Sequence, residues 1–524
     1  MNKNKLKVSD VIATRRLLPR RGKAAWQSFL NKVQSDKQIK LTFVSFLLFT
    51  SLILSACEAK ASASGLPLPE PTESVPQAPD WKGRPEYAPG ELVDYTAQTG
   101  DTIPALASHF NTSVEEIYEA NPFIPRDATT MPPGMPMKIP IYYLPLWNNP
   151  YQIIPDQAFV YGPSLVGFNT SAYVADRPGW LKNIYAWAGR DNRTGAEIVD
   201  YVGINYSISP RLLLALLEYQ AEALSQTEKP SARYMLGFEK TYYEGVYLQL
   251  VGAANTLNDG YYKWRIGALT EFELKDGTIV RPDPWQNAAT VALQYYFSQM
   301  LPADEYRLAV GPEGLFATYL ALFGDPWADS VEHIPGSLQQ PELQLPFPAG
   351  QTWYYTGGPH TGWGLGQPYT ALDFAPPADK SGCFPAEEKN YAIAMADGIV
   401  VRSEFGLVAL DLDGDGDERT GWVLVYLHVA TKGRAPTGLS LKAGDPVGYP
   451  SCEGGRVTGT HIHISRKYNG EWIPADGPLP FNLEGWVAHN GARAYLGTLS
   501  KGSLTVEACE CGDLYSQISS EPVQ

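Results

Sequence analysis

The chain has 524 residues, 44% of them hydrophobic, and a net charge of −15. That length predicts three or four domains, and that composition is typical of globular rather than disordered chains. The charge is unevenly placed, because residues 1–56 carry about +9 and the remainder about −24. An acidic body argues against nucleic-acid binding, which requires a basic face against phosphate, so we predict no nucleic-acid partner.

The first predicted segment, residues 1–57, joins a basic stretch to an apolar run of about 14 residues that ends LTFVSFLLFTSLILSAC. Such a run is typical of a secretory signal and is slightly short for a membrane-spanning helix. Its last four residues, 54–57, resemble a bacterial lipobox, which implies cleavage before Cys57 and lipid on its thiol. An uncleaved anchor helix is the alternative. Both interpretations place the body outside the cytoplasmic membrane, on its outer face and in the cell envelope.

Residues 58–90 are rich in proline, serine and alanine. A segment of this composition cannot bury enough apolar surface to order itself. We therefore predict a disordered tether, extended where its prolines cluster.

Residues 91–143 predict a strand, a Gly-Asp-Thr turn, two short helices, an Asn-Pro break and a closing strand. This order resembles a LysM module, a βααβ unit that grips N-acetylglucosamine-containing glycans. The resemblance implies a groove between the first strand–helix turn and the second helix–strand loop. Its contact residues would be Gly100, Asp101, Thr102, Asn121 and Pro122. A LysM-like spacer that has lost its ligand is the alternative.

Residues 145–340 are dense in tyrosine and tryptophan and mostly helical in pattern, with Ser209 and Pro210 well placed to begin one helix. The stretch ISPRLLLALLEYQ weakly resembles the first core helix of lysozyme-like lytic transglycosylases. In that family the helix ends in a catalytic glutamate followed by serine, whereas Gln220 and Ala221 stand here. Glutamine cannot protonate a glycosidic oxygen. We predict a non-catalytic spacer or glycan surface, with a working glycosidase as the alternative.

From residue 345 the pattern changes to short β-type runs broken by glycine, proline and aspartate. This pattern predicts an all-β, antiparallel domain over 345–510, followed by a tail at 511–524. Five of the seven histidines of the chain lie in this domain. His461 and His463 alternate along one predicted strand, so both imidazoles face the same side.

A catalytic zinc site takes three ligands from His, Asp or Glu and leaves a fourth position open. Asp373 lies on a strand between Leu372 and Phe374 and therefore points away from those apolar neighbours. A carboxylate buried there without a partner is costly, and a cation removes the cost. With His360 after a Gly-Gly-Pro loop and His463 on its strand, the sequence predicts one zinc site.

Four motifs in order, TGGPH, LDF, YLH and SCEGGRVTGTHIHIS, resemble the lysostaphin-type zinc endopeptidases, in particular their β-lytic branch. The resemblance implies that His360, Asp373 and His463 hold one Zn²⁺ per chain. It implies that His428 and His461 flank the attacking water without binding metal. One of these two would accept the proton and the other would stabilise the oxyanion, and the sequence leaves open which does which. The branch prefers glycine-containing bonds in peptidoglycan.

Four cysteines remain if Cys57 carries lipid, and an even number in an exported protein suggests disulfides. Of three pairings we favour Cys383 with Cys452, since both lie in one predicted domain; free thiols are the alternative. At 411–417 the pattern matches the first half of a Ca²⁺ loop, but the closing glutamate is missing, so a polar hairpin turn is the favoured interpretation.

These features together predict a membrane-tethered cell-wall hydrolase. Its zinc domain would cut peptide cross-bridges of peptidoglycan while its LysM module holds the glycan strands. The alternatives are a non-catalytic wall-binding or hydrolase-activating protein and a glycosidase in the helical domain.

Overall fold

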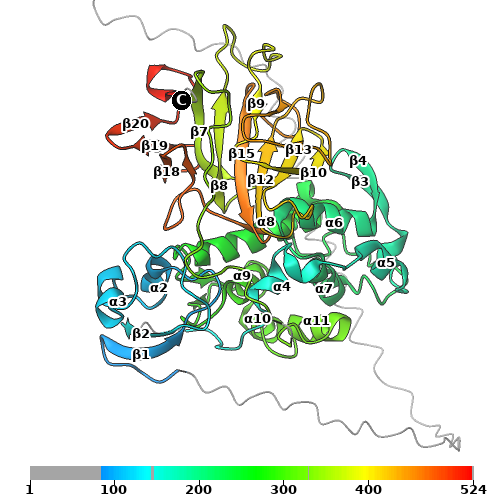
Figure 1. The fold of residues 1–524 in the computed structure, drawn as a ribbon. Coiled ribbons are helices and arrows are strands. Elements are labelled where there is room, and N and C mark those ends of the chain that lie inside the picture. The colour runs from blue at the N-terminus through cyan, green and yellow to red at the C-terminus, as the bar shows by residue number, and fades with distance from the viewer. Residues whose placement is uncertain (1–83, 143–146, 329, 522–524) are drawn as a thin grey trace, which may run out of the picture. The chain divides into compact units, whose positions relative to one another are not determined.

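The computed structural model describes residues 84–142, 147–328 and 330–521 (Figure 1). The predicted signal segment with Cys57 and most of the predicted tether lie outside the described residues. Within the described part of the chain, no helix combines the length and the apolar character needed to cross a bilayer.

The N-terminal module has the βααβ order predicted from its sequence. Strands β1 (Glu91–Thr96) and β2 (Pro136–Ile141) pair antiparallel and enclose α2 (Ile103–His109) and α3 (Val114–Ala120). The hydroxyl of Thr102 accepts the Ala105 N–H and so caps α2, and Ser113 and Glu116 form a reciprocal capping box at α3. Buried aliphatic and aromatic side chains from all four elements form one small core.

The middle region is helical, as its pattern predicts. Its helices are α4 (Asp156–Phe159), η1 (Pro163–Leu165), α5 (Thr170–Ala175), η2 (Trp180–Asn183), α6 (Gly195–Tyr206), α7 (Pro210–Ala221), η3 (Thr241–Tyr243), α8 (Val246–Arg265), α9 (Ala288–Ser298), α10 (Ala303–Ala309) and α11 (Leu315–Phe323). Two small hairpins accompany them, β3 (Tyr185–Ala188) with β4 (Asp191–Thr194) and β5 (Phe272–Glu273) with β6 (Ile279–Val280).

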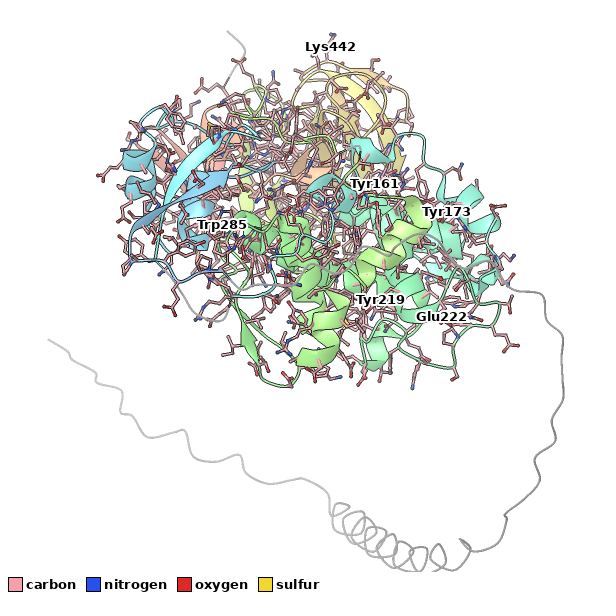
Figure 2. All side chains as sticks on the ribbon, turned by 90° about the horizontal axis from the view of Figure 1, so that it is seen from below. Tyr161, Tyr173, Tyr219, Glu222, Trp285 and Lys442 are labelled. Atoms are coloured by element: carbon pink, nitrogen blue, oxygen red, sulfur yellow. A yellow bond between two sulfur atoms is a disulfide. The ribbon has the colours of Figure 1, made fainter. Side chains whose placement is uncertain are left out.

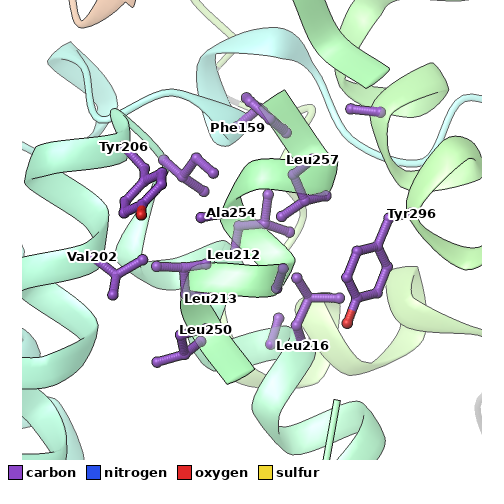
Figure 3. Packing of buried hydrophobic residues seen from close by; sticks show 14 of the residues in the cluster. Phe159, Val202, Tyr206, Leu212, Leu213, Leu216, Leu250, Ala254, Leu257 and Tyr296 are labelled. Carbon is purple, nitrogen blue, oxygen red and sulfur yellow. The ribbon is translucent and has the colours of Figure 1, made fainter. Parts of the chain in front are cut away.

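Helices α7 and α8 form the centre of this region, where Leu213, Leu216, Leu250 and Leu257 are completely buried (Figure 3). Helix α7 begins where the sequence predicts, with proline at its first position. The Ser209 hydroxyl makes no capping hydrogen bond, however, and the Ser209 N–H is instead donated to the Phe159 carbonyl.

The C-terminal region is built on a nine-stranded antiparallel sheet of order β13-β10-β11-β12-β15-β8-β7-β21, with β16 beside β15. Its strands are β7 (Thr352–Thr361), β8 (Tyr369–Ala375), β10 (Gly398–Glu404), β11 (Leu407–Asp411), β12 (Trp422–Leu427), β13 (Ser440–Leu441), β15 (Ile462–Tyr468), β16 (Glu471–Trp472) and β21 (Gln517–Ser519). Smaller sheets pair β9 (Ala392–Ile393) with β14 (Pro446–Gly448) and align β17 (Asn482–Leu483), β18 (Trp486–Asn490), β19 (Gly497–Lys501) and β20 (Leu504–Glu507); η4 (Leu514–Ser516) precedes β21. Part of the predicted tail is therefore a strand of the main sheet.

The two faces of the main sheet are both covered, but by different parts of the chain. Leu424 and Tyr426 point into a core made by the β domain itself. Val423, Val425 and Leu427 point the other way and share one core with the helical region. The helices therefore pack directly on the sheet, below it in the view of Figure 1.

A buried arginine lies where the three regions meet. Arg265, at the end of α8, donates to the Thr99 carbonyl of the N-terminal module. It forms ion pairs of 3.0 Å with Asp156 and with Glu471 of the β domain. Trp285, labelled in Figure 2, adds a further link by donating from its indole N–H to the Asp94 carbonyl over 3.0 Å. Buried charges are tolerated only when paired in this way, so the contacts fix the regions against one another.

Candidate metal centre and active site

The three predicted metal ligands come from three neighbouring strands of the main sheet. In the register of the ladder His463 on β15 stands directly opposite Asp373 on β8. Strand β7 bulges repeatedly between Tyr355 and Thr361, and these irregularities bring His360 to the same place. One ligand atom from each of the three residues lies within 4.8 Å of the other two.

Backbone carbonyls fix the tautomers of both histidines. His360 Nδ1 lies 2.8 Å from the Gly358 carbonyl and His463 Nε2 lies 3.2 Å from the Gly362 carbonyl. A carbonyl oxygen can only accept, so each of these nitrogens carries the proton. The lone pairs of His360 Nε2 and His463 Nδ1 therefore face Asp373 Oδ1, which they approach to 3.3 and 3.1 Å.

This arrangement fits a divalent cation. Asp373 is only 7% exposed, and no hydrogen bond reaches its Oδ1 atom. Three acceptor atoms that converge in a buried space repel each other unless a cation lies between them. Two imidazoles and one carboxylate are a donor set that zinc commonly takes in catalytic sites. Gly357 leaves space for the Asp373 carboxylate, since a Cβ atom at position 357 would lie 2.6 Å from Asp373 Oδ2.

The other two histidines lie beside this centre without joining it. His428 follows β12 directly in a left-handed conformation, and its Nδ1 donates to the Glu453 carbonyl over 2.7 Å. His461 Nδ1 donates to the Gly459 carbonyl over 2.8 Å. The two ring centroids are 4.6 Å apart, and His461 Nε2 is 3.6 Å from Asp373 Oδ1. Both residues thus keep an Nε2 lone pair available for a proton.

The electrostatics of the cluster follow from burial and mutual charge. Burial lowers the pKa of His428 to about 3, and the neighbouring His461 and His463 act in the same direction. Burial alone would raise the pKa of Asp373, but the charges of His360 and His461 outweigh it and hold that pKa well below its usual value. Burial acts to lower the pKa of His360, but the charge of Asp373 outweighs the effect of burial and raises that pKa, whereas burial lowers the pKa of His463.

The cluster opens into a cleft of about 900 Å³. Every described residue that lines the cleft belongs to the β domain, between residues 354 and 512. A disulfide joins Cys383, on the loop at 376–384, to Cys452, beside the segment that bridges to His461, with Cα atoms 5.9 Å apart. The favoured cysteine pairing is thus present, together with a second bridge between Cys509 and Cys511.

Comparison with known proteins places these regions among relatives. A family model described as "LysM domain" matches residues 95–140, and one described as "LasA, N-terminal domain" matches residues 152–337. Protease LasA of Pseudomonas aeruginosa is 26% identical over 365 residues, which cover 65% of this chain and 80% of that protein. The beta-lytic metalloendopeptidase of Achromobacter lyticus is 29% identical over 144 residues, 26% of this chain and 35% of the relative. The resemblance to lysostaphin-type, β-lytic endopeptidases and the resemblance to a LysM module are thus confirmed.

Beta-lytic metalloendopeptidase of Lysobacter enzymogenes is 28% identical over 137 residues, 26% of this chain and 74% of that protein. Among solved structures, an M23 metalloprotease named pseudoalterin is 21% identical with a TM-score of 0.27, covering 32% of this chain and 96% of its own. The comparisons support a metalloendopeptidase with a LysM module. The lysozyme-like origin of the helical region stays a prediction, because its match is to the LasA N-terminal domain.

Of the five residues predicted to touch glycan in the LysM module, the structure brings two to a common cavity. Gly100 and Thr102 line it. Asp101 instead accepts hydrogen bonds from the Tyr95 hydroxyl and the Gln98 N–H, both 2.7 Å, and burial raises its pKa to about 6.

The remaining two predicted glycan residues lie outside that cavity's lining. Asn121 is 1% exposed and is fully used in binding the Ile117 and Lys138 backbones. Pro122 is exposed beside it. Glycan contact by these residues stays a prediction.

Two other predicted positions hold the fold locally. Gln220 accepts a hydrogen bond of 2.6 Å from the Tyr296 hydroxyl, and Glu218 accepts the N–H groups of residues 224 and 225. In the loop at 411–417, the side chains of Asp411 and Asp413 accept backbone N–H groups of the same loop. One carboxylate oxygen each from Asp411, Asp413 and Asp415 lies within 4.8 Å of the others, so the choice between a polar turn and a Ca²⁺ site stays open.

Sequence reasoning missed Tyr495, which lies in the loop between β18 and β19. Its ring stacks on that of His360 with centroids 4.1 Å apart and remains 49% exposed in the cleft. Its carbonyl accepts the Gly358 N–H over 2.9 Å, so it also supports the turn that orients His360. No motif marks this residue, because it is more than one hundred positions from the histidine it touches.

Proposed function

We propose that this protein is a zinc-dependent endopeptidase that cleaves peptide cross-bridges of peptidoglycan, at glycine-containing bonds. The observation that carries the proposal is the convergence of three acceptor atoms, from His360, Asp373 and His463, beside two further histidines with free Nε2 atoms. Relatives named as protease and metalloendopeptidase support the same reaction class.

A zinc ion held by these three residues would supply Lewis acidity and a water of lowered pKa. Gly358 and Gly362 hold the two ligating imidazoles in the required tautomer through their carbonyls. His461 and His428 present their Nε2 atoms to the cleft. One takes the proton of the attacking water and returns it to the leaving amine, and the other, in its imidazolium form with a proton taken from solvent, stabilises the oxyanion.

We further propose that the LysM module grips the glycan strands of the same polymer, which raises the local concentration of cross-bridges at the cleft. The location proposed is the cell envelope, with the chain exported and tethered to the outer face of the cytoplasmic membrane through lipid on Cys57. The basic, apolar start of the sequence and the lipobox-like residues 54–57 support that location.

The test is digestion of defined muropeptides by the full chain, with and without chelator, read by mass spectrometry. We expect His463→Ala to lower cleavage of cross-bridges by at least about 100-fold, since loss even of groups behind metal ligands costs 10–100-fold. His489→Ala, a histidine on β18 that is bonded to the Ser500 hydroxyl, is the matched control and should retain activity. Undiminished turnover in His463→Ala would exclude the proposal, and release of new reducing ends would point to a glycosidase.

A further inference from the structure

A second cavity, of about 750 Å³, lies between the LysM module and the β domain. One wall consists of Gly100, Thr102 and Tyr118 with the loop at 126–130. The opposite wall consists of Tyr369 and the segment 473–479 of the β domain. This volume falls within the range of small-molecule sites, and the mixture of aromatic, aliphatic and a few polar side chains is typical of them.

Contacts that do not depend on a ligand hold the LysM wall against the 334–338 segment, which packs on Ile473 of the β domain. Thr99 and Ile334 exchange hydrogen bonds of 3.2 and 3.0 Å, and the Thr129 and Thr130 hydroxyls each donate to carbonyls of the 335–338 segment over 2.7 Å. On the far side of the module His109 stacks on Trp264 with ring centroids 3.4 Å apart. A site whose halves are already fixed saves the ordering cost that a hinged site pays on binding.

We propose that this cavity takes N-acetylhexosamine units of a glycan strand and that the β domain supplies half of the contacts. The inference rests on the proposed glycan binding by the LysM module and adds a second binding surface to it. The two walls therefore form one composite site, in which neither domain binds the sugar alone as well as the pair does.

The side chains of the β-domain wall suit an uncharged sugar that carries hydroxyl and acetamido groups. The half-buried ring of Tyr369 offers an apolar surface next to a polar tip. Gln367 uses its side-chain oxygen to accept the Tyr369 N–H, which leaves its NH₂ group for a ligand. Asp476 accepts the N–H groups of Gly477 and Asn490 and retains lone pairs for sugar hydroxyls.

Two charged residues of the cavity lining are buried and already paired with each other. Arg265 and Glu471 pair with each other at 3.0 Å, and Glu471 also bonds to His333 over 2.7 Å. Neither is available to bind a phosphate or a carboxylate without breaking that network. A neutral ligand is consistent with this arrangement. Arg126, which also lines the cavity, lies outside that network and stacks over the Tyr118 ring at 4.2 Å from its centroid.

Strand β8 connects this cavity to the metal centre. Tyr369 and Asp373 both lie on this strand, whose pairing with β7 is irregular between Tyr369 and Ala371. Four residues at about 3.3 Å each separate Tyr369 from Asp373 by roughly 13 Å. An extended peptide of about four residues spans the same distance. A glycan in the cavity would thus present its attached peptides to the cleft at one fixed reach.

The experiment is calorimetric titration of the full chain with chitohexaose, a soluble hexamer of β-1,4-linked N-acetylglucosamine. We expect Tyr369→Ala to raise the Kd by about 3- to 10-fold, as expected for loss of one aromatic contact. Pro478→Trp, an exposed position on the opposite rim from the LysM module, should raise it at least about 10-fold by filling the cavity, and Pro478→Ala is its matched control. Tyr185→Ala, a 70% exposed tyrosine on β3, controls for loss of any surface aromatic.

The outcomes separate this inference from the proposed function. Binding by the wild type that is unchanged in both Tyr369→Ala and Pro478→Trp overturns the composite site and leaves LysM glycan binding intact. Absence of binding by the wild type overturns the glycan function of the LysM module and the composite site with it. A thermal melt of each variant distinguishes lost contacts from lost folding.

Discussion

Two buried polar clusters lie near opposite ends of strand β15, and they differ in how their charges are satisfied. At one end Arg265 and Glu471 form a paired network with Asp156, Tyr261 and His333. At the other end Asp373 Oδ1 receives no hydrogen bond and faces two ring nitrogens that have only lone pairs to offer. Opposite charges pair in the first cluster, although Asp156 Oδ2 and His333 Nδ1 receive no hydrogen bond, whereas acceptor atoms face one another in the second.

The contrast shows how a structural cluster can be told from a functional one by counting donors and acceptors. Both clusters are buried and both contain histidine and carboxylate. In the Arg265 cluster positive and negative groups alternate, so burial is offset by pairing. In the candidate metal centre acceptors meet acceptors, and a cation placed among them removes the conflict. Two changes test this distinction directly, and two further changes test residues around the clusters.

The largest effect is expected at Asp373. Asp373→Asn keeps the shape of the side chain but removes the negative charge that attracts the cation. We expect metal loss, measured by elemental analysis, and a fall in peptide cleavage of about 1,000-fold, since Lewis-acid stabilisation contributes several kcal/mol. Full metal content with full activity in this variant would contradict the ligand assignment.

A change in the Arg265 cluster should alter the stability of the protein rather than its activity. Glu471→Ala leaves Arg265 and His333 buried without their shared partner, so we expect the free energy of unfolding to fall by about 3 kcal/mol. Burial acts to raise the pKa of Glu471, but the effects of Arg265 and His333 are together larger, so the pKa is lowered to about 2. Its contribution is therefore present above the unfolded value near 4.5 and is lost as the pH falls toward 2.

Denaturant titration at pH 7 and at pH 3 measures that effect. Glu244→Ala, which breaks an exposed ion pair with Arg233, is the matched control and should leave stability nearly unchanged. Equal stability of Glu471→Ala and the wild type would mean that the network is dispensable.

A smaller effect is expected where the helical region supports the metal centre. Asn255 and Asp259 of α8 accept the N–H groups of Leu365 and Gln367, each over 2.8 Å, in the loop that carries the Gly362 carbonyl behind His463. Asn255→Ala should lower kcat about 10-fold with metal content retained, as expected for a group that positions a ligand. A change in KM alone would contradict a positioning role.

The smallest effect concerns a buried histidine outside both clusters. Burial lowers the pKa of His109 to about 3, from the ordinary 6.5. The stability that depends on its neutral form is present above pH 6.5 and is lost as the pH falls below it. We expect a loss of about 1 kcal/mol between pH 7.5 and 5.5, beyond that of His109→Phe, which keeps a ring on Trp264. Identical pH profiles of the two proteins would refute this.

The direction in which single residues of the candidate metal centre face could be predicted locally, whereas their convergence was implied by the resemblance of the four motifs to lysostaphin-type endopeptidases. Alternation on a strand places His461 and His463 on one face, and Leu372 and Phe374 fix the direction of Asp373. The role of Asn121 could not be predicted in the same way, because the amide that ends one helix binds the backbone of Lys138, on the closing strand. Whether such a residue is structural or binds ligand depends on that fold contact.

The contacts between domains were beyond sequence reasoning for a similar reason. Thr130 and Pro335 are 205 positions apart, and neither belongs to a motif. The composite cavity, the stacking of Tyr495 on His360 and the support of the 362–368 loop by α8 all depend on such distant pairs. Motifs report chemistry that is repeated within one element, whereas docking depends on surface shapes that no short pattern encodes.

Thr99, Thr129 and Thr130 of the LysM module form hydrogen bonds with the backbone of residues 334–338, and these bonds limit the motion of the module. Because these bonds fix the LysM module, the module cannot rotate relative to the β domain. A protein bound to glycan through that module would therefore point its metal-binding cleft in one direction only. Successive cleavage events would then require the whole molecule to dissociate from the polymer and bind again.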